Sequence, residues 1–233
     1  MREIVFDTET TGLDPASGDR MVEIGCIELV NRIPTGNSFH AYFNPQRTMP
    51  FEAERVHGLG DAFLADKPLF SARAEELIAF LGDAPLVAHN AQFDFGFLNH
   101  ELEACGHQAI GLDRMIDTLV LARRRHPGAK HSLDALCSRY GVDRSHRVLH
   151  GALLDAELLA QVYVELTGGR QIGFSLGADA AAQAGNQNIE AEVQLVVASN
   201  KTFRAPRPHQ ASEAEILRHK SFVDTLNSPL WNN

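Results

Sequence analysis

The segment 4–12, IVFDTETTG, places two carboxylates at the end of an apolar strand. Side chains alternate with period two along an extended chain, so Asp7 and Glu9 share one face if the strand continues that far. Acidic residues at a strand end often do no more than cap a turn. Whether this pair is structural or functional therefore depends on where the other acidic residues of the chain fall.

Two aspartates begin the apolar stripes of predicted helices. In 89–105, HNAQFDFGFLNHELEAC, helical spacing aligns Asp94 with Phe97, Leu98, Leu102 and Cys105. In 150–166, HGALLDAELLAQVYVEL, it aligns Asp155 with Leu159, Val162 and Leu166. An Asp in a first turn stabilises a helix by ~0.3–1 kcal/mol through the helix dipole, which explains a surface Asp well. It explains an Asp in line with the core poorly, because carboxylates are rarely buried unpaired.

The four carboxylates Asp7, Glu9, Asp94 and Asp155 could meet where the first strand ends. Like charges ~4 Å apart repel by about 4 kcal/mol per pair at an effective dielectric constant near 20. A divalent cation would remove this conflict, and oxygen ligands favour Mg²⁺ or Mn²⁺ over zinc, which prefers His and Cys. The pattern predicts a site for such ions.

His150 precedes Asp155 by five residues, about 140° around an ideal helix, so it is not expected on the Asp155 stripe. Gly151 follows it, which places it on the entry to the helix. A lone His is usually a surface or packing residue. Its position beside Asp155 favours a functional interpretation, because an imidazole with a near-neutral pKa suits a base that activates water.

The fold class predicted for the chain is α/β, with a mixed five-stranded sheet flanked by helices. Short links between the first three strands favour an antiparallel meander, after which helices and strands alternate. The expected strands are 2–6, 21–30, 38–43, 86–89 and 115–117, and the expected helices are 70–81, 91–105, 118–125, 132–140 and 152–167.

Net charge, cysteine spacing and the length of apolar runs exclude several types of protein. The net charge of −9 argues against a protein that holds duplex DNA through many phosphate contacts, although a site of carboxylates and metal need not be basic. The three cysteines form no CxxC pair, so neither a disulfide framework nor a zinc site is expected. The start of the chain does not resemble a signal peptide, and no apolar run approaches the roughly 18 residues of a membrane span. A cytoplasmic protein is expected.

The chain changes character after residue 169. Residues 177–188, GADAAAQAGNQN, have the composition of a flexible linker, and 189–197 alternates like a strand without an obvious partner. Ser212 and Glu215 form a capping box that predicts a helix whose apolar face is too small to fold alone. The expected division is a domain over 1–169, a binding motif and linker over 170–188, and a partner-docking segment over 189–233.

Three motifs in order, DTETTG from Asp7, HNAQFD ending at Asp94 and HGALLD ending at Asp155, resemble those of the DEDDh branch of 3′–5′ exonucleases. HSLDALC at 131–137 adds to the likeness, which is strongest to the proofreading nucleases of bacterial replicative DNA polymerases. The resemblance implies a ribonuclease H-like fold and two Mg²⁺ or Mn²⁺ ions held by the four acidic residues. It also implies that His150 is the general base and that mispaired 3′-terminal nucleotides leave as 5′-monophosphates.

The same resemblance implies substrate and partner sites. The residues that would line the pocket for the terminal nucleotide are Thr10, Leu13, Val56, His57, Asn90 and Phe93. QIGFSL at 171–176 would bind the beta sliding clamp through Gln171, Phe174 and Leu176, and the segment 189–233 would dock on the alpha subunit of the polymerase. A frayed DNA end would be preferred, because a mispaired base leaves the stack at lower cost.

Two other functions remain open from the sequence. A free-standing RNA-trimming exonuclease of the same branch would share every metal ligand, and the segment beyond residue 169 is what argues against it. A non-catalytic replisome scaffold would have no reason to crowd carboxylates together.

Overall fold

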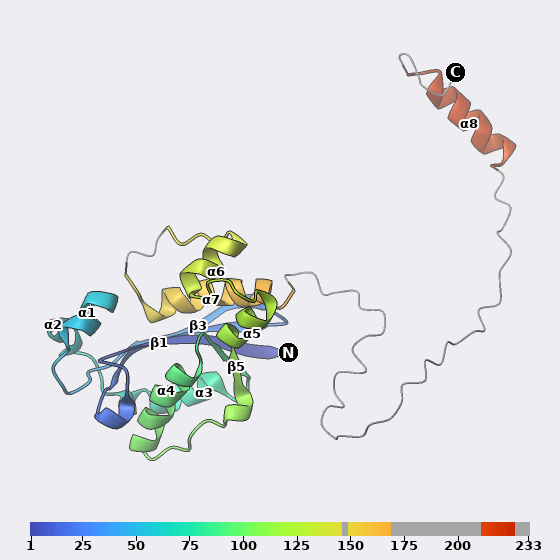
Figure 1. The fold of residues 1–233 in the computed structure, drawn as a ribbon. Helices are drawn as coiled ribbons and strands as arrows, with labels where there is room; N and C mark the ends of the chain where they lie inside the picture. The colour runs from blue at the N-terminus through green and yellow to red at the C-terminus, as the bar shows by residue number, and fades with distance from the viewer. Residues whose placement is uncertain (146–148, 169–210, 227–233) are drawn as a thin grey trace, which may run out of the picture. The chain divides into compact units, whose positions relative to one another are not determined.

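The computed structural model describes residues 1–145, 149–168 and 211–226 (Figure 1). The chain divides into two units, Met1–Leu176 and Gly177–Asn233. The clamp motif expected at 171–176, the linker at 177–188 and the strand at 189–197 lie outside the described residues. The domain boundaries stay a prediction.

A mixed five-stranded sheet forms the centre of the first unit, as the sequence predicts. Its strands are β1 (Arg2–Thr10), β2 (Met21–Val30), β3 (Ile33–Tyr42), β4 (Leu86–Ala88) and β5 (Met115–Asp117). The spatial order is β3-β2-β1-β4-β5, with the first three strands antiparallel and with β4 and β5 parallel to β1. β1 runs four residues past its predicted end, so Asp7 and Glu9 both stand in the ladder, opposite Gly25 and Glu23.

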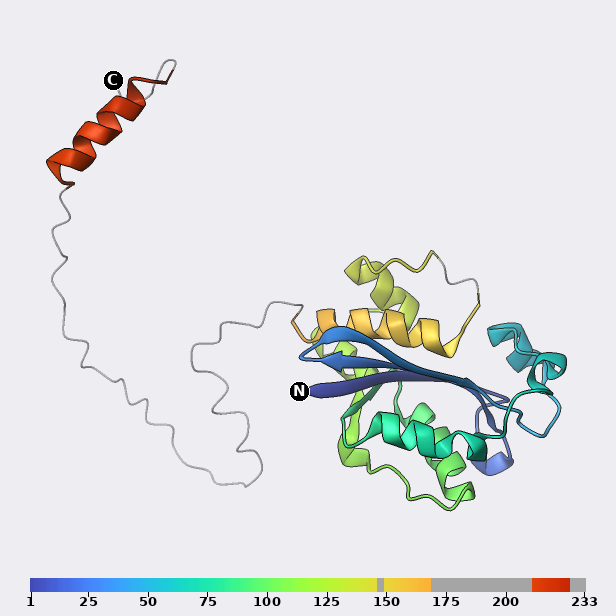
Figure 2. The ribbon, with the colours of Figure 1, turned by 180° about the vertical axis from the view of Figure 1, so that it is seen from behind.

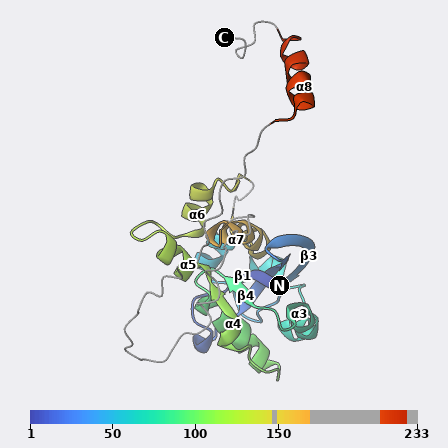
Figure 3. The same ribbon diagram turned by 90° about the vertical axis from the view of Figure 1, so that its right-hand side faces the viewer.

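Helices cover both faces of the sheet (Figures 2 and 3). On one face α3 (Ala74–Leu81) and α4 (Gln92–Ala104) pack over Ile4 and Phe6 of β1. On the other face α7 (Ala152–Leu166) packs over Val5, with α5 (Thr118–Arg125) and α6 (Leu133–Tyr140) beside it. Because side chains alternate along β1, Asp7 and Glu9 point to the same face as Val5, the face that α7 covers.

Local signals set the helix ends where the sequence predicts them. Asp117 accepts a hydrogen bond from Leu119 N at 2.8 Å and caps α5, and Ser132 accepts one from Ala135 N at 3.3 Å and caps α6. Gly141 closes α6 in the left-handed conformation at φ 67°. The helix expected over 70–81 is instead a 3₁₀ turn, η2 (Phe70–Ala72), followed by α3.

Several short elements were not predicted. They are α1 (Phe51–His57), α2 (Asp61–Leu64) and the 3₁₀ turns η1 (Pro15–Ser17) and η3 (Leu112–Arg114). Helices this short carry too little periodicity to be recognised and depend on packing against the rest of the domain. β3 also begins five residues before its predicted start, because its exposed first half carries no apolar alternation.

The described part of the second unit contains α8 (Glu213–Val223). The predicted capping box is present, since Glu215 accepts hydrogen bonds from the backbone N–H and the hydroxyl of Ser212 at 2.9 and 2.7 Å. Ile216, Leu217 and Phe222 are exposed on this helix. Within the described ranges, no helix combines the length and apolarity required to cross a membrane.

Candidate active site

Glu9, His150 and Asp155 form a compact group at the end of β1. One potential ligand atom from each residue lies within 4.8 Å of the other two. Glu9 is 8% exposed and Asp155 only 3%, so two carboxylates are buried side by side. Glu9 comes from the first strand, whereas His150 and Asp155 come from a loop and the helix that follows it, far along the sequence.

A glycine in β2 makes this convergence possible. Gly25 pairs with Asp7 across the β1–β2 ladder. A Cβ atom on Gly25 would lie 2.3 Å from both the Cα and the backbone nitrogen of Leu153, in the first turn of α7. The missing side chain therefore lets the start of α7 rest on the sheet and brings Asp155 to the Glu9 side chain. Sequence reasoning missed Gly25, although a glycine inside an apolar strand commonly marks a close backbone approach.

His150 lies on the loop before α7, outside the helical stripe, as its spacing from Asp155 suggests. Gly151 is the N-cap of α7, whose first helical residue is Ala152. The His150 side chain is 48% exposed, and its Nδ1 atom lies 3.2 Å from Oδ2 of Asp155. Its backbone N–H donates to the carbonyl oxygen of Val56 at 3.2 Å. The imidazole thus touches the carboxylate group while half of it stays open to solvent.

Asp94 stands in the first turn of α4 and is buried. It accepts a 2.8 Å hydrogen bond from the hydroxyl of Thr8, whose side chain points to the sheet face that α4 covers. Burial raises the pKa of Asp94 to about 7, and Asp117 adds to the rise, while the Thr8 hydrogen bond opposes it. A carboxylate in such a place is stabilised by a nearby cation.

Of the four acidic residues, Glu9 and Asp155 are the two that the described structure brings together with His150. Asp7 is half-buried on the same face as Glu9, and Asp94 belongs to the other layer, yet neither is a member of the Glu9, His150 and Asp155 group. The donor set nevertheless fits a divalent cation, because buried carboxylate oxygens dominate it.

The residues expected to line a nucleotide pocket follow the ends of β1, α1 and β4. Thr10 is the last residue of β1 and Leu13, in the turn beyond it, is 83% exposed. Asn90 is exposed with φ 62° between β4 and α4, and Phe93 packs against Phe97 with ring centroids 5.0 Å apart. Phe93 is therefore partly a packing residue.

Val56 and His57 end α1. Val56 is 42% exposed, whereas His57 is buried. Nδ1 of His57 accepts the Leu59 N–H at 3.0 Å, so the proton of the neutral ring is on Nε2. That Nε2 is buried without a hydrogen bond of normal geometry in the described part of the chain. Burial lowers the pKa of His57, which favours the neutral ring, while a polar contact with the backbone of Thr10 opposes that shift.

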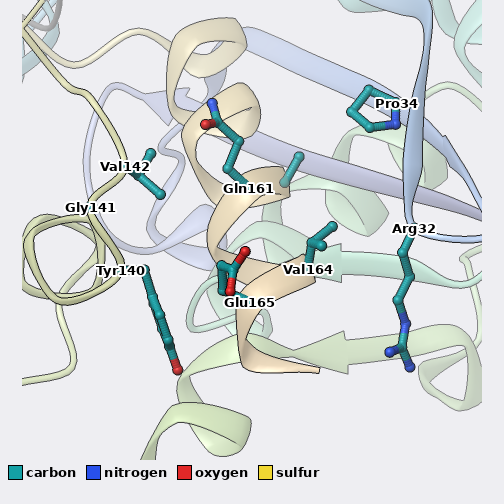
Figure 4. Close-up of a pocket in the computed structure, with 9 residues that line it drawn as sticks. Arg32, Pro34, Tyr140, Gly141, Val142, Gln161, Val164 and Glu165 are labelled. Atoms are coloured by element: carbon teal, nitrogen blue, oxygen red, sulfur yellow. The ribbon is translucent and has the colours of Figure 1, made fainter. Parts of the chain in front are cut away.

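A cavity of about 230 Å³ lies elsewhere in the first unit (Figure 4). It opens between the β2–β3 turn at Arg32, the end of α6 at Tyr140 and the outer side of α7 at Gln161 and Glu165. None of the residues expected to bind metal or nucleotide lines it.

Comparisons with known proteins agree with this geometry. A family model described as exonuclease matches residues 4–163. A solved structure of exonuclease X in complex with 5′ overhanging duplex DNA covers 70% of this chain and 90% of its own, with a TM-score of 0.55 and 28% identity. Fold and site thus define the class of exonucleases.

Curated relatives narrow the class. DNA polymerase III subunit epsilon of Rickettsia felis is 49% identical over 229 residues, with 97% of both chains covered. The subunit of the same name from Escherichia coli K12 is 40% identical over 242 residues and covers 99% of this chain and 97% of its own. The chain belongs to the family of DNA polymerase III epsilon subunits.

Proposed function

We propose that this protein is the proofreading 3′–5′ exonuclease of a bacterial replicative DNA polymerase. It removes mispaired 3′-terminal nucleotides of DNA as 5′-monophosphates. The observation that carries the proposal is the group of Glu9, His150 and Asp155 at the end of β1, in a chain of the epsilon family. A carboxylate pair with an imidazole at its edge is suited to hydrolysis of a phosphodiester.

Asp7, Glu9, Asp94 and Asp155 would hold two divalent cations, Mg²⁺ or Mn²⁺. The burial of Asp155, Glu9 and Asp94 supports this assignment, because like charges so close together are costly without a cation. When bound, the ions would neutralise the carboxylates and stabilise negative charge on the phosphate oxygens of the substrate.

His150 would act as the general base. Its Nδ1 lies against Asp155 Oδ2 while half of the side chain faces solvent, so the other ring nitrogen can reach water. The Asp155 carboxylate would orient the ring and stabilise the proton that it takes up. Placement on a loop leaves the ring accessible to the substrate.

The terminal nucleotide would lie against Thr10, Leu13, Val56, His57, Asn90 and Phe93. The buried Nε2–H of His57 supports such a pocket, because it makes no hydrogen bond of normal geometry within the described residues and an oxygen of the nucleotide could accept from it. The exposed Leu13 side chain offers an apolar surface for a base that has left the stack.

Two partners complete the proposal. The segment 189–233 would bind the alpha subunit of DNA polymerase III, supported by the exposed apolar residues Ile216, Leu217 and Phe222 of α8. Residues 171–176, with Gln171, Phe174 and Leu176, would bind the beta sliding clamp, and the protein would then act at the replisome in the cytoplasm. A tether between the two would raise the concentration of nuclease near the primer end.

The test compares nucleotide release from 3′-mismatched DNA, 3′-paired DNA and RNA primers, with Mg²⁺ and with chelator. We expect Mg²⁺-dependent release of 5′-monophosphates, fastest from mismatched DNA, and near-complete loss in Asp7→Ala with retained binding of the alpha subunit. A preference for RNA would instead support a trimming enzyme. Activity that is absent, or unchanged in chelator, would support the scaffold.

A further inference from the structure

The end of α1 is in direct contact with the loop that carries His150. The His150 N–H donates to the Val56 carbonyl oxygen at 3.2 Å. Leu149 lies against Gly58 so closely that a Cβ on Gly58 would be 2.7 Å from Leu149 Cδ1. One hydrogen bond and one packing contact therefore join the base and its neighbour to α1.

Helix chemistry explains why this end of α1 can hold the loop. The last four carbonyl groups of a helix have no intrahelical partner, and the Val56 carbonyl is one of them. Gly58 ends the helix at φ 76° and donates its N–H to Glu54 O at 2.7 Å, so the chain turns away and leaves that carbonyl accessible. The absence of a side chain on Gly58 then makes room for Leu149.

We propose that residues 56–58, at the end of α1, hold the loop of the general base His150 in position. Gly58 acts through His150 and is a positioning residue rather than a catalytic one. This inference rests on the proposed function, in which His150 activates water. Val56 contributes its carbonyl oxygen to the base loop, and its side chain, which is 42% exposed, is one of those expected to line the nucleotide pocket.

The test compares Gly58→Ala with Gly141→Ala. Both glycines end a helix in the left-handed conformation, at φ 76° and 67°, and both donate to a carbonyl of their own helix. Their surroundings differ, because a Cβ on Gly141 would meet nothing within 4 Å. The two substitutions thus carry the same backbone strain, and only Gly58→Ala meets a side chain of the base loop, the Cδ1 methyl of Leu149, which is 49% exposed.

We expect Gly58→Ala to lower kcat by about 3- to 10-fold, because the Leu149 side chain can yield part of the contact before the base itself moves. Its KM for the primer and its affinity for a 5′-mononucleotide in Mg²⁺, measured by calorimetry, should stay within about twofold of the wild type. Gly141→Ala should lose similar thermal stability and keep its kcat. Equal kcat in the two variants, or a parallel loss of mononucleotide binding in Gly58→Ala, would overturn the inference.

A second experiment tests the contact between Gly58 and Leu149 by changing Leu149. Leu149→Ala should lower kcat by about threefold, and Gly58→Ala combined with Leu149→Ala should match Leu149→Ala alone, because the clash needs both side chains. If the losses of kcat in the two single variants multiply in the double variant, the proposed contact is contradicted. If Gly58→Ala does not fold, the kcat of Leu149→Ala decides, and a wild-type kcat in that variant would overturn the inference. Failure of the wild type to release nucleotides in Mg²⁺ is a different outcome and would count against the proposed function.

Discussion

Gly25 of β2 and Leu153 of α7 meet backbone to backbone, with room for no more than a hydrogen atom between them. Gly25 is also the cross-strand neighbour of Asp7. The distance from the Asp7 and Glu9 carboxylates to the Asp155 carboxylate therefore depends on Gly25, a residue without a charged or metal-binding side chain.

Gly25→Ala should push the first turn of α7 off the sheet. Overpacking of this kind typically costs about 1–3 kcal/mol of stability, and a displacement near 1 Å at a reacting group can cost about 100-fold in rate. Urea unfolding and nucleotide release would measure both effects. The control is Gly96→Ala in α4, where a Cβ meets nothing within 4 Å and a stabilisation of about 0.5–1 kcal/mol is expected. Full activity in Gly25→Ala would show that α7 has another way to hold Asp155.

Asp155→Asn should abolish activity and yet stabilise the protein in chelator. Removal of one charge relieves the repulsion with Glu9, whereas bound Mg²⁺ stabilises only a protein that can hold it. Thermal unfolding should therefore show a higher Tm than the wild type without metal and a smaller rise on adding Mg²⁺. Glu157→Gln removes the same charge from an exposed position of α7 and should change neither quantity. A Tm for Asp155→Asn below that of the wild type in chelator would contradict the electrostatic account.

Glu28→Gln should destabilise the domain in a pH-dependent way. Glu28 is buried and accepts hydrogen bonds from Thr35, Arg2 and Asn37 at 2.7, 2.6 and 2.8 Å. The Thr35, Arg2 and Asn37 donors lower the pKa of Glu28 from 4.5 to about 2. A lowered folded-state pKa contributes stability above pH 4.5 that is lost as the pH falls towards 2.

The difference in unfolding free energy between wild type and Glu28→Gln should thus be largest at neutral pH and shrink steadily below pH 4.5. Urea titrations at several pH values would measure it. Glu52→Gln is the control, because its partner Arg55 is exposed and surface pairs contribute little. A gap that stays constant from neutral pH to pH 3 would mean that Glu28 acts by packing alone.

Deletion of residues 170–233 should separate catalysis from recruitment. We expect the truncated protein to release nucleotides from a mismatched primer at about the wild-type rate, because all residues proposed to bind metal or the terminal nucleotide lie before residue 170. It should no longer bind the alpha subunit or the beta clamp in surface-binding assays. A tail that binds neither protein in the full-length chain would remove the replisome assignment and leave the nuclease.

Much of the fold could be read from local pattern. β2, β5 and α5 have the predicted bounds, because apolar runs, a capping Asp117 and the Pro127 and Gly128 pair mark their ends. Asp94 and Asp155 are buried on their helices as their stripes predict. The sequence did not predict α1 and α2, because their few residues carry no periodicity. The contact between the end of α1 and the His150 loop could therefore not be predicted either.

The sequence alone determined which acidic and apolar residues face inward, because the spacing of apolar residues along each helix and strand predicts which of its faces is buried. How closely segments approach was decided only by the tertiary structure. Gly25 and Gly58 are ordinary glycines in the sequence, and only the packing of α7 on β2 and of Leu149 on α1 gives them a role. The physical reason is that a distance between remote backbones depends on both partners at once, whereas a sequence pattern describes one segment at a time.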